Sequence, residues 1–213
     1  MSHSTQIARQ LVDVCHRLYR KGFVTATDGN VSVRLPGGNI LTTPTSMNKE
    51  RVTESDLVEV TLEGGHVSKQ RKPSMELGMH LFIYQQRKDV AAIVHAHPTY
   101  ATGFAAARIP LDQQLLPEVV FGLGAVPLAQ YATPSTSEVA DSIAPYVKDS
   151  SAILLGNHGV VTFGKDLDDA FFKMEKVEHA AHITFVARLL GGERPLSSAD
   201  VEKLFATFGK QKL

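Results

Sequence analysis

The segment Ala91-Ala92-Ile93-Val94-His95-Ala96-His97-Pro98 is an apolar run that ends in two histidines separated by one residue. Residues i and i+2 of a strand point to the same face of a sheet, so His95 and His97 can direct two ring nitrogens at one point. A third histidine, His158, follows another apolar run, at the turn Gly156-Asn157-His158-Gly159. The sequence therefore predicts buried strands that carry a binding site at their ends.

Three neutral imidazoles are a common protein ligand set for a catalytic Zn²⁺ that keeps one coordination position open. Such a site retains the +2 charge of the ion, which can polarise a carbonyl group or stabilise an enolate. We therefore predict that His95, His97 and His158 bind Zn²⁺ or a similar divalent ion, and that the protein is a metal-dependent lyase.

The composition is typical of one α/β domain that spans residues 1–213. Hydrophobic residues make up 43% of the chain, and 22 basic residues balance 22 acidic ones. This balance of charge argues against nucleic acid or an anionic membrane as a partner. The sequence has no apolar run long enough to predict a membrane span. The lone cysteine, Cys15, favours a reducing, cytoplasmic location, and its position on an apolar helix face indicates a small core residue.

Hydrophobic periodicity alternates between helix and strand patterns along the chain. Helices are expected at residues 5–21, 75–86, 99–107, 137–146, 166–190 and 198–208, and strands at 31–35, 40–41, 57–60, 90–97, 152–155 and 160–163, with another strand within 119–127. Hairpin patterns dominate the first half of the chain. We therefore expect an α/β fold with a central mixed or antiparallel sheet flanked by helices, rather than a doubly wound parallel sheet.

Glu76 and three polar loops are further candidates for chemistry. Glu76 falls in the first turn of the helix expected at 75–86, where a carboxylate either stabilises the helix dipole or acts as a general base or metal ligand. The loops at 25–30, 42–46 and 72–74 offer hydroxyls, amides and backbone N–H groups that can hold an anion. Each loop taken alone is also an ordinary turn.

A rival group of metal ligands consists of Glu175, His179 and His182, which fall at i, i+4 and i+7 on one helix face. The surrounding helix is polar on that side, so we interpret this group as a solvated face.

Together these motifs resemble the class II aldolase/adducin-head family over residues 5–209, in a pattern closest to its L-fuculose-phosphate aldolases. The motifs are Gly29-Asn30-Val31-Ser32-Val33-Arg34, Thr43-Pro44-Thr45, Pro73-Ser74-Met75-Glu76, His95-Ala96-His97, Gln130-Tyr131-Ala132-Thr133 and Asn157-His158-Gly159. The resemblance implies a three-layer fold and a homotetramer with active sites between subunits. The adducin-like branch lacks the metal site, so the intact histidines argue against a non-catalytic assembly module, which is the alternative of another class.

The resemblance also implies roles for individual residues. His95, His97 and His158 would bind the metal, and Glu76 would transfer protons. The residues that would hold a substrate phosphate are Gly29, Asn30, Thr45, Ser46 and Ser74. The implied reaction is retro-aldol cleavage of a small ketose 1-phosphate to dihydroxyacetone phosphate and a short aldehyde.

Three departures from the family pattern leave the substrate open. Thr45-Ser46 stands in place of Thr-Gly, Ser74-Met75 stands in place of Ser-Ser, and both tyrosines that would protonate the leaving aldehyde are missing. Phe208 stands near one tyrosine position, either as an apolar lid over the neighbouring subunit's site or as a packing residue.

Glu118 lies near the other missing tyrosine. We predict that it is the acid that replaces the phenol, with a pKa raised by its apolar neighbours, the alternative being a surface charge. Two other reactions on the same metal site stay open: dehydration of a sugar phosphate through Glu118, and decarboxylation of a 3-keto sugar acid phosphate.

Overall fold

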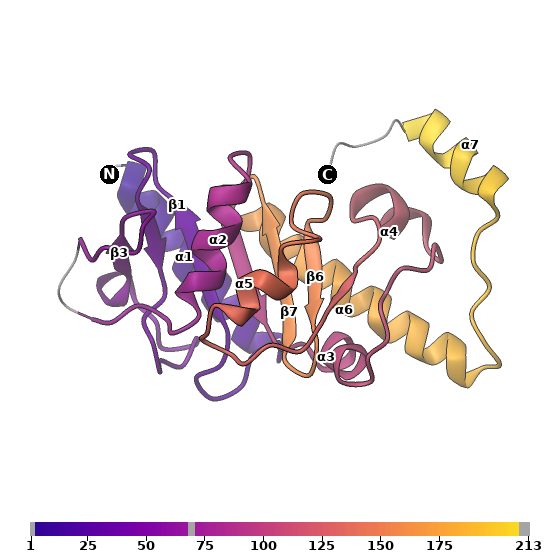
Figure 1. The fold of residues 1–213 in the computed structure, drawn as a ribbon, viewed down its shortest axis with the longest axis horizontal. Coiled ribbons are helices and arrows are strands. Elements are labelled where there is room, and N and C mark those ends of the chain that lie inside the picture. Colours follow the sequence, from indigo (N-terminus) through magenta and orange to yellow (C-terminus); the bar gives the residue numbers. More distant parts are fainter. Residues whose placement is uncertain (1–2, 68–70, 209–213) are drawn as a thin grey trace.

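One seven-stranded sheet lies between two layers of helices in the computed structural model, which describes residues 3–67 and 71–208 (Figure 1). The strands are β1 (Asn30–Arg34), β2 (Ile40–Thr42), β3 (Val58–Val60), β4 (Ala92–Ala96), β5 (Leu128–Ala129), β6 (Ala152–Leu155) and β7 (Gly159–Gly164). The helices are α1 (His3–Arg20), α2 (Leu77–Gln86), α3 (Thr99–Ala106), α4 (Pro117–Gly122), α5 (Glu138–Ile143), α6 (Leu167–Leu189) and α7 (Ser198–Phe208), with a 3-10 helix η1 (Glu54–Asp56) before β3.

The strand order is β3-β2-β1-β4-β7-β6-β5, and every neighbouring pair is antiparallel except β5 and β6. The prediction of a mixed sheet flanked by helices is therefore confirmed. Strand β4 occupies the centre, where His95 lies opposite Asn30 of β1 on one side and Val161 of β7 on the other. The organisation of residues 1–213 as one domain stays a prediction.

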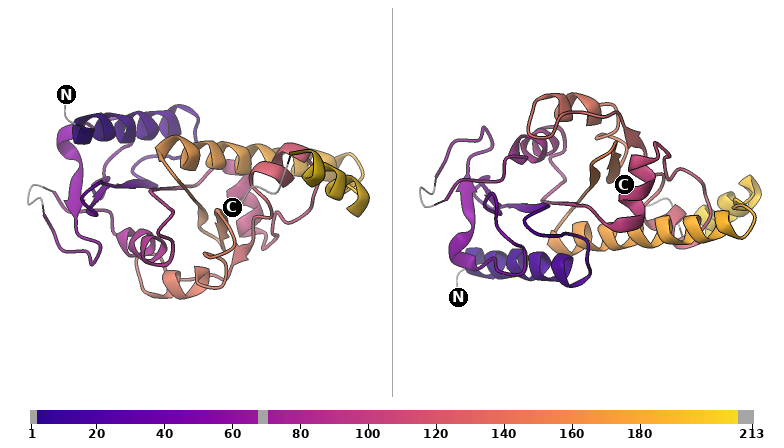
Figure 2. Two further views of the ribbon diagram at one scale, coloured as in Figure 1. Left: turned by 90° about the horizontal axis from the view of Figure 1, so that it is seen from above. Right: turned by 90° about the horizontal axis from the view of Figure 1, so that it is seen from below.

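Alternation along the strands divides the core between the two faces of the sheet. Val94 and Ala96 of β4 pack with the apolar residues of α1, α3 and α6, whereas Ile93 packs with those of α2 and α5. Figure 2 shows α1 and α6 on one side of the sheet and α2 and α5 on the other. Because side chains alternate in direction, His95 shares the face of Ile93, which is the face that α2 covers.

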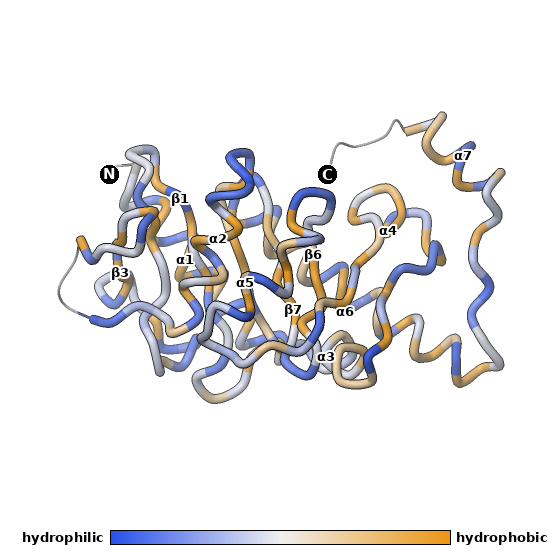
Figure 3. The backbone as a smooth tube through the Cα atoms, in the orientation of Figure 1, coloured by the Kyte–Doolittle hydropathy of each residue, from blue (hydrophilic) through white to orange (hydrophobic). Residues whose placement is uncertain are grey.

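Apolar residues follow the central strands, and hydrophilic residues gather in the loops between elements, as Figure 3 shows. In the parts of the chain that the structure describes, no helix is both long and apolar enough to cross a membrane.

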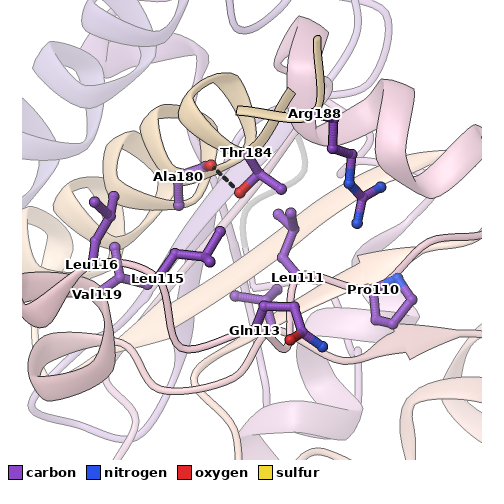
Figure 4. Close-up of a pocket in the computed structure, with 10 residues that line it drawn as sticks. Pro110, Leu111, Gln113, Leu115, Leu116, Val119, Ala180, Thr184 and Arg188 are labelled. Carbon is purple, nitrogen blue, oxygen red and sulfur yellow. Dashed lines mark hydrogen bonds between the residues drawn. The ribbon is translucent and has the colours of Figure 1, made fainter. Parts of the chain in front are cut away.

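The strand predicted within residues 119–127 is wrong. Residues 117–122 form α4 with Pro117 at its start, and the strand of this region is β5, at 128–129. Val119 turns toward Ala180 and Thr184 of α6 and lines a small pocket there with Leu115 and Leu116 (Figure 4). The first part of the apolar run is therefore a helix that packs against α6, whereas Val126 near its end forms a β-bridge with Leu111. Periodicity in so short a segment cannot distinguish these states.

Most other boundaries differ from the prediction by only one to three residues. Helix α2 begins at Leu77, so Glu76 is its N-cap residue rather than a member of the first turn. Helix α5 is shorter than the expected 137–146, and its N-cap residue is Ser137. Asp166, the first residue of the range expected for α6, is its N-cap, and its side chain accepts a hydrogen bond from the backbone N–H of Asp169 at 2.8 Å.

Candidate active site

The structure brings His95, His97 and His158 together at one end of the sheet. Their candidate ligand atoms all lie within 4.8 Å of one another. The Nε2 atoms of His95 and His97 are 3.1 Å apart, and the ring centroids of His95 and His158 are 4.7 Å apart. His95 is fully buried, whereas the other two rings are partly exposed. Among the described residues, this is the group whose geometry could hold a metal ion.

The hydrogen bond of His95 to the backbone fits a metal ligand. Its Nδ1 lies 2.9 Å from the carbonyl oxygen of Val160, and because a carbonyl can only accept, Nδ1 carries a proton. Burial lowers the pKa of His95, but the charge and hydrogen bond of Glu76 outweigh it, so the net shift is upward. When the ring loses its second proton to bind a metal ion, Nε2 has a free lone pair that faces the other histidines. Burial, followed by the charge of His95, lowers the pKa of His97 and of His158 to about 4, so both rings are neutral donors near pH 7.

Glu76 projects from the start of α2 into this cluster. Its Oε2 lies 3.3 Å from Nε2 of His95, and its Oε1 lies 3.2 Å from Nε2 of His158. Asn30 donates from Nδ2 to Oε2 at 2.9 Å. Burial raises the pKa of Glu76, but the charges of His95 and His158 and the hydrogen bonds from His95 and Asn30 outweigh it, so the net shift is downward.

One oxygen of Glu76 is available to a ligand. Although Oε1 is close to His158, it is buried and has no hydrogen bond of good geometry, and Oδ1 of Asn30 is also buried and unpartnered. The carboxylate therefore offers a charged acceptor beside three nitrogen donors, a donor set that suits a divalent ion.

The three predicted anion loops lie side by side next to this cluster. Pro44 and Pro73 form a β-bridge, and the N–H of Thr45 donates to the carbonyl of Lys72 at 3.0 Å. The hydroxyl of Ser74 accepts a hydrogen bond from the N–H of Glu76 at 3.2 Å. The loop at 42–46 is bonded to β1, because the N–H of Thr43 donates to the carbonyl of Val31 at 3.0 Å. Asn48, which follows that loop, is bonded to the first loop, because its Nδ2 donates to the carbonyl of Ala26 at 2.8 Å.

Gly29 and Ser46 give two of these loops unusual backbone conformations. Gly29 has φ +70°, and a Cβ on it would lie 2.8 Å from the carbonyl oxygen of His95. Ser46 adopts φ 54° at the position where the family pattern has glycine. Non-glycine residues enter this region at a cost, so Ser46 holds a strained conformation at the site.

A row of polar contacts joins β1 to α2 behind the site, and the sequence analysis missed it. The hydroxyl of Ser32 lies 2.7 Å from Nδ1 of His80 and 2.9 Å from the phenol of Tyr84, and all three side chains are buried. Burial lowers the pKa of His80 to about 3, so its ring is neutral. The row, here called the β1–α2 seam, pairs Asn30 with Glu76, Ser32 with His80 and Arg34 with Tyr84.

Glu118 is the predicted site residue that the structure does not bring into the cluster. It is exposed on α4, which lies beside α7 and away from α2 in Figures 1 and 2. No hydrogen bond or ion pair among residues 3–67 and 71–208 links its side chain to the histidines or Glu76. Phe121 of the same helix packs against Phe208 at a centroid distance of 5.6 Å.

The rival group on α6 does not form a metal site among the described residues. Glu175 pairs with Lys21 at 2.7 Å, and His182 stacks on Tyr100 at a centroid distance of 3.8 Å. Cys15 is a fully buried core residue, as predicted, and burial raises the pKa of its thiol to about 12.

The fold and this cluster agree with a known family. A family model described as the class II aldolase and adducin N-terminal domain matches residues 9–185, and the chain belongs to this family. Members of this family that are class II aldolases use a divalent metal ion, and family membership together with the three histidines supports an enzyme of the metal-dependent aldehyde-lyase class, as predicted.

Individual relatives are similar over most of the chain. The L-fuculose phosphate aldolase of Methanococcus maripaludis is 37% identical over 178 residues, which cover 82% of this chain and 94% of that protein. The 3-oxo-tetronate 4-phosphate decarboxylase of Escherichia coli K12 is 32% identical over 195 residues, which cover 89% of each protein. The solved structure of an L-fuculose 1-phosphate aldolase matches with a TM-score of 0.88 at 32% identity, over 98% of this chain and 97% of that one.

Proposed function

We propose that this protein is a metal-dependent aldolase that cleaves a small ketose 1-phosphate to dihydroxyacetone phosphate and a short aldehyde. The observation that carries the proposal is the convergence of three histidine nitrogens and the Glu76 carboxylate beside three hydroxyl-rich loops. The similarity to L-fuculose phosphate aldolases over most of the chain supports the same reaction type.

His95, His97 and His158 would hold the ion, for which we propose Zn²⁺. When bound, the ion would polarise the substrate carbonyl and stabilise the negative charge that develops on its oxygen. Gly29, Asn30, Thr45, Ser46 and Ser74 would bind the phosphate through backbone N–H groups, hydroxyls and an amide.

Glu76 would accept a proton from the substrate carbon skeleton and return it later in the reaction. Its carboxylate lies within 3.3 Å of the histidine nitrogens, and Asn30 fixes its orientation through Oε2. The lowered pKa keeps the group ionised, and therefore able to accept a proton, at neutral pH.

A cavity of about 340 Å³ beside Glu76 gives the rest of the substrate room. Met75 and Met79 of the α2 region line one side of it, and the hydroxyl-bearing residues 135–137 line the other. This mixed lining suits a short chain that carries both methylene and hydroxyl groups.

The second candidate is decarboxylation of a 3-keto sugar acid phosphate. The similarity to a 3-oxo-tetronate 4-phosphate decarboxylase over 89% of the chain favours it over the remaining alternatives.

We further propose a homotetramer in which Glu118 acts at the site of a neighbouring subunit. Leu189 and Leu190 at the end of α6 are 72% and 82% exposed, and Phe185 of the same helix lines an apolar groove against α3. Exposed apolar patches of this kind mark protein contacts. A cytoplasmic location, favoured by the lone buried thiol, belongs to the same proposal.

The deciding experiment is a coupled assay for dihydroxyacetone phosphate on a panel of ketose 1-phosphates, with zinc-loaded wild type and Glu76→Gln in parallel. Product from wild type, with a loss of about 10²–10⁴-fold in a Glu76→Gln protein that still binds zinc, supports the proposal. Release of CO₂ from 3-oxo sugar acid phosphates without dihydroxyacetone phosphate from any ketose would replace it with the decarboxylase.

A further inference from the structure

Lys49 is a buried lysine that the proposed reaction does not use. Only 1% of its surface is exposed. Its Nζ donates to the carbonyl oxygen of Thr27 at 3.0 Å and to that of Met47 at 2.8 Å. Thr27 belongs to the loop that carries Gly29 and Asn30, whereas Met47 follows Thr45 and Ser46. The ammonium group is therefore bonded to the first anion loop and to the residue that directly follows the second.

A buried ammonium group is costly unless other groups compensate its charge. Two backbone carbonyls use two of its three N–H donors. No ion pair joins Lys49 to a carboxylate within residues 3–67 and 71–208, although Asp28 and Glu76 are near enough to interact with it. Burial lowers the pKa of Lys49, and Cys15, Asp28 and Glu76 oppose the shift. The loops thus enclose a positive charge that lacks a bonded counterion.

The neighbouring cations Arg71 and Lys72 do not provide an equivalent buried positive charge between the loops. Arg71 is paired with Asp56 at 2.7 Å, and Lys72 is exposed to solvent, where its charge is screened. Lys49 is the cation that bonds directly to the backbone of Thr27 and Met47.

We propose that Lys49 is a positioning residue for the phosphate group of the substrate. Its ammonium holds Thr27 of the loop at 25–30 and Met47, which follows the loop at 42–46, at a fixed spacing, so that the N–H groups and hydroxyls of both loops face one anion. Its charge compensates that of the bound phosphate. This inference rests on the proposed function, since it concerns the phosphate end of the same substrate.

Titration of inorganic phosphate into the zinc-loaded protein tests the inference by calorimetry, without a substrate. We expect Lys49→Met to weaken phosphate binding at least tenfold and to leave zinc affinity within twofold of wild type. The matched control is Lys88→Met, the same change at an exposed lysine after α2, which should bind phosphate as wild type does. Equal phosphate affinity in folded Lys49→Met and wild type would overturn the inference.

Steady-state kinetics separate positioning from a general structural role. Lys49→Met should raise KM for the phosphorylated substrate at least tenfold while kcat stays within threefold. A role in stability alone predicts lower zinc affinity and lower kcat with an unchanged phosphate dissociation constant, and that result would contradict the inference.

A measurement on wild type covers the case in which Lys49→Met does not fold. Buried, hydrogen-bonded ammonium groups exchange protons slowly, so the ¹⁵N resonance of the Lys49 Nζ should be visible and should shift when phosphate, but not chloride at equal ionic strength, is added. An unmoved resonance in a protein that binds phosphate would overturn the inference alone. If wild type binds no phosphate, the inference and the phosphate end of the proposed function both fail, whereas the zinc site is judged separately by metal analysis.

Discussion

Replacement of Gly29 by alanine tests how closely the first anion loop approaches the central strand. Gly29 and Gly22 both adopt φ +70°, so alanine at either position costs about 1–2 kcal/mol in backbone conformation. A Cβ at Gly22 meets nothing within 4 Å, whereas at Gly29 it would lie 2.6 Å from Cγ1 of Val24 and 2.8 Å from the carbonyl oxygen of His95. Overpacking of this kind adds about 1–3 kcal/mol, and a strand carbonyl cannot move aside cheaply.

Gly22→Ala is therefore the matched control for Gly29→Ala. For a chain of this length, 1 kcal/mol shifts Tm by about 2–4 °C, so we expect Tm to fall by roughly 4 °C for Gly22→Ala and roughly 10 °C for Gly29→Ala. Displacement of the His95 backbone should also weaken zinc binding by about 10–100-fold in Gly29→Ala only. Calorimetry and a zinc titration measure both effects. Melting temperatures of the two variants within 2 °C of each other would refute the reasoning.

Three further outcomes are expected. His80 is buried and neutral in the folded protein, where its pKa is about 3, whereas its pKa in the unfolded chain is about 6.5. Between these two pH values only the unfolded chain binds the extra proton, so the stability of the folded protein falls as the pH drops below 6.5. At pH 4.5 this loss is about 2.7 kcal/mol, and urea unfolding of His80→Gln should show a flatter pH dependence by that amount; an identical slope would contradict a neutral His80. Zinc at 100 times its dissociation constant should stabilise wild type by about 2.7 kcal/mol, and EDTA should remove that increment from wild type but not from His97→Ala, as scanning calorimetry can check. Mixing inactive Glu76→Gln with inactive Glu118→Gln should restore activity after the two proteins exchange subunits. If the subunits exchange and the mixture stays inactive, Glu118 lies outside the site.

The convergence of His95, His97 and His158 was predictable because its signal is local. The spacing of His95 and His97 on one strand, and a third histidine at a strand end, require only the two-residue period of a strand. The fold class followed from hairpin patterns for the same reason. The prediction of a strand within 119–127 failed, because Val119 packs against α6 through a contact that no local period encodes.

Lys49 and His80 were not predictable from their surroundings in the sequence. Lys49 lies in the run Asn48-Lys49-Glu50-Arg51, which reads as a solvated loop, and only the fold places the carbonyls of Thr27 and Met47 around it. His80 lies one turn after Glu76 on a helix that is apolar on most sides, so its partner Ser32, 48 residues away, was not evident.

The β1–α2 seam has a consequence for how this chain can change length during evolution. Two residues of a strand advance about 6.6 Å, and four residues of a helix advance about 6.0 Å, so pairs at every second strand residue match pairs at every fourth helix residue. Insertion or deletion of a single residue within 30–34 or 76–84 would put the pairs on either side of it out of register, so the Asn30–Glu76 pair could no longer form together with the other two. Length variation among descendants of this chain should therefore accumulate in the turns at 36–39 and 62–65 and be absent from both members of the seam.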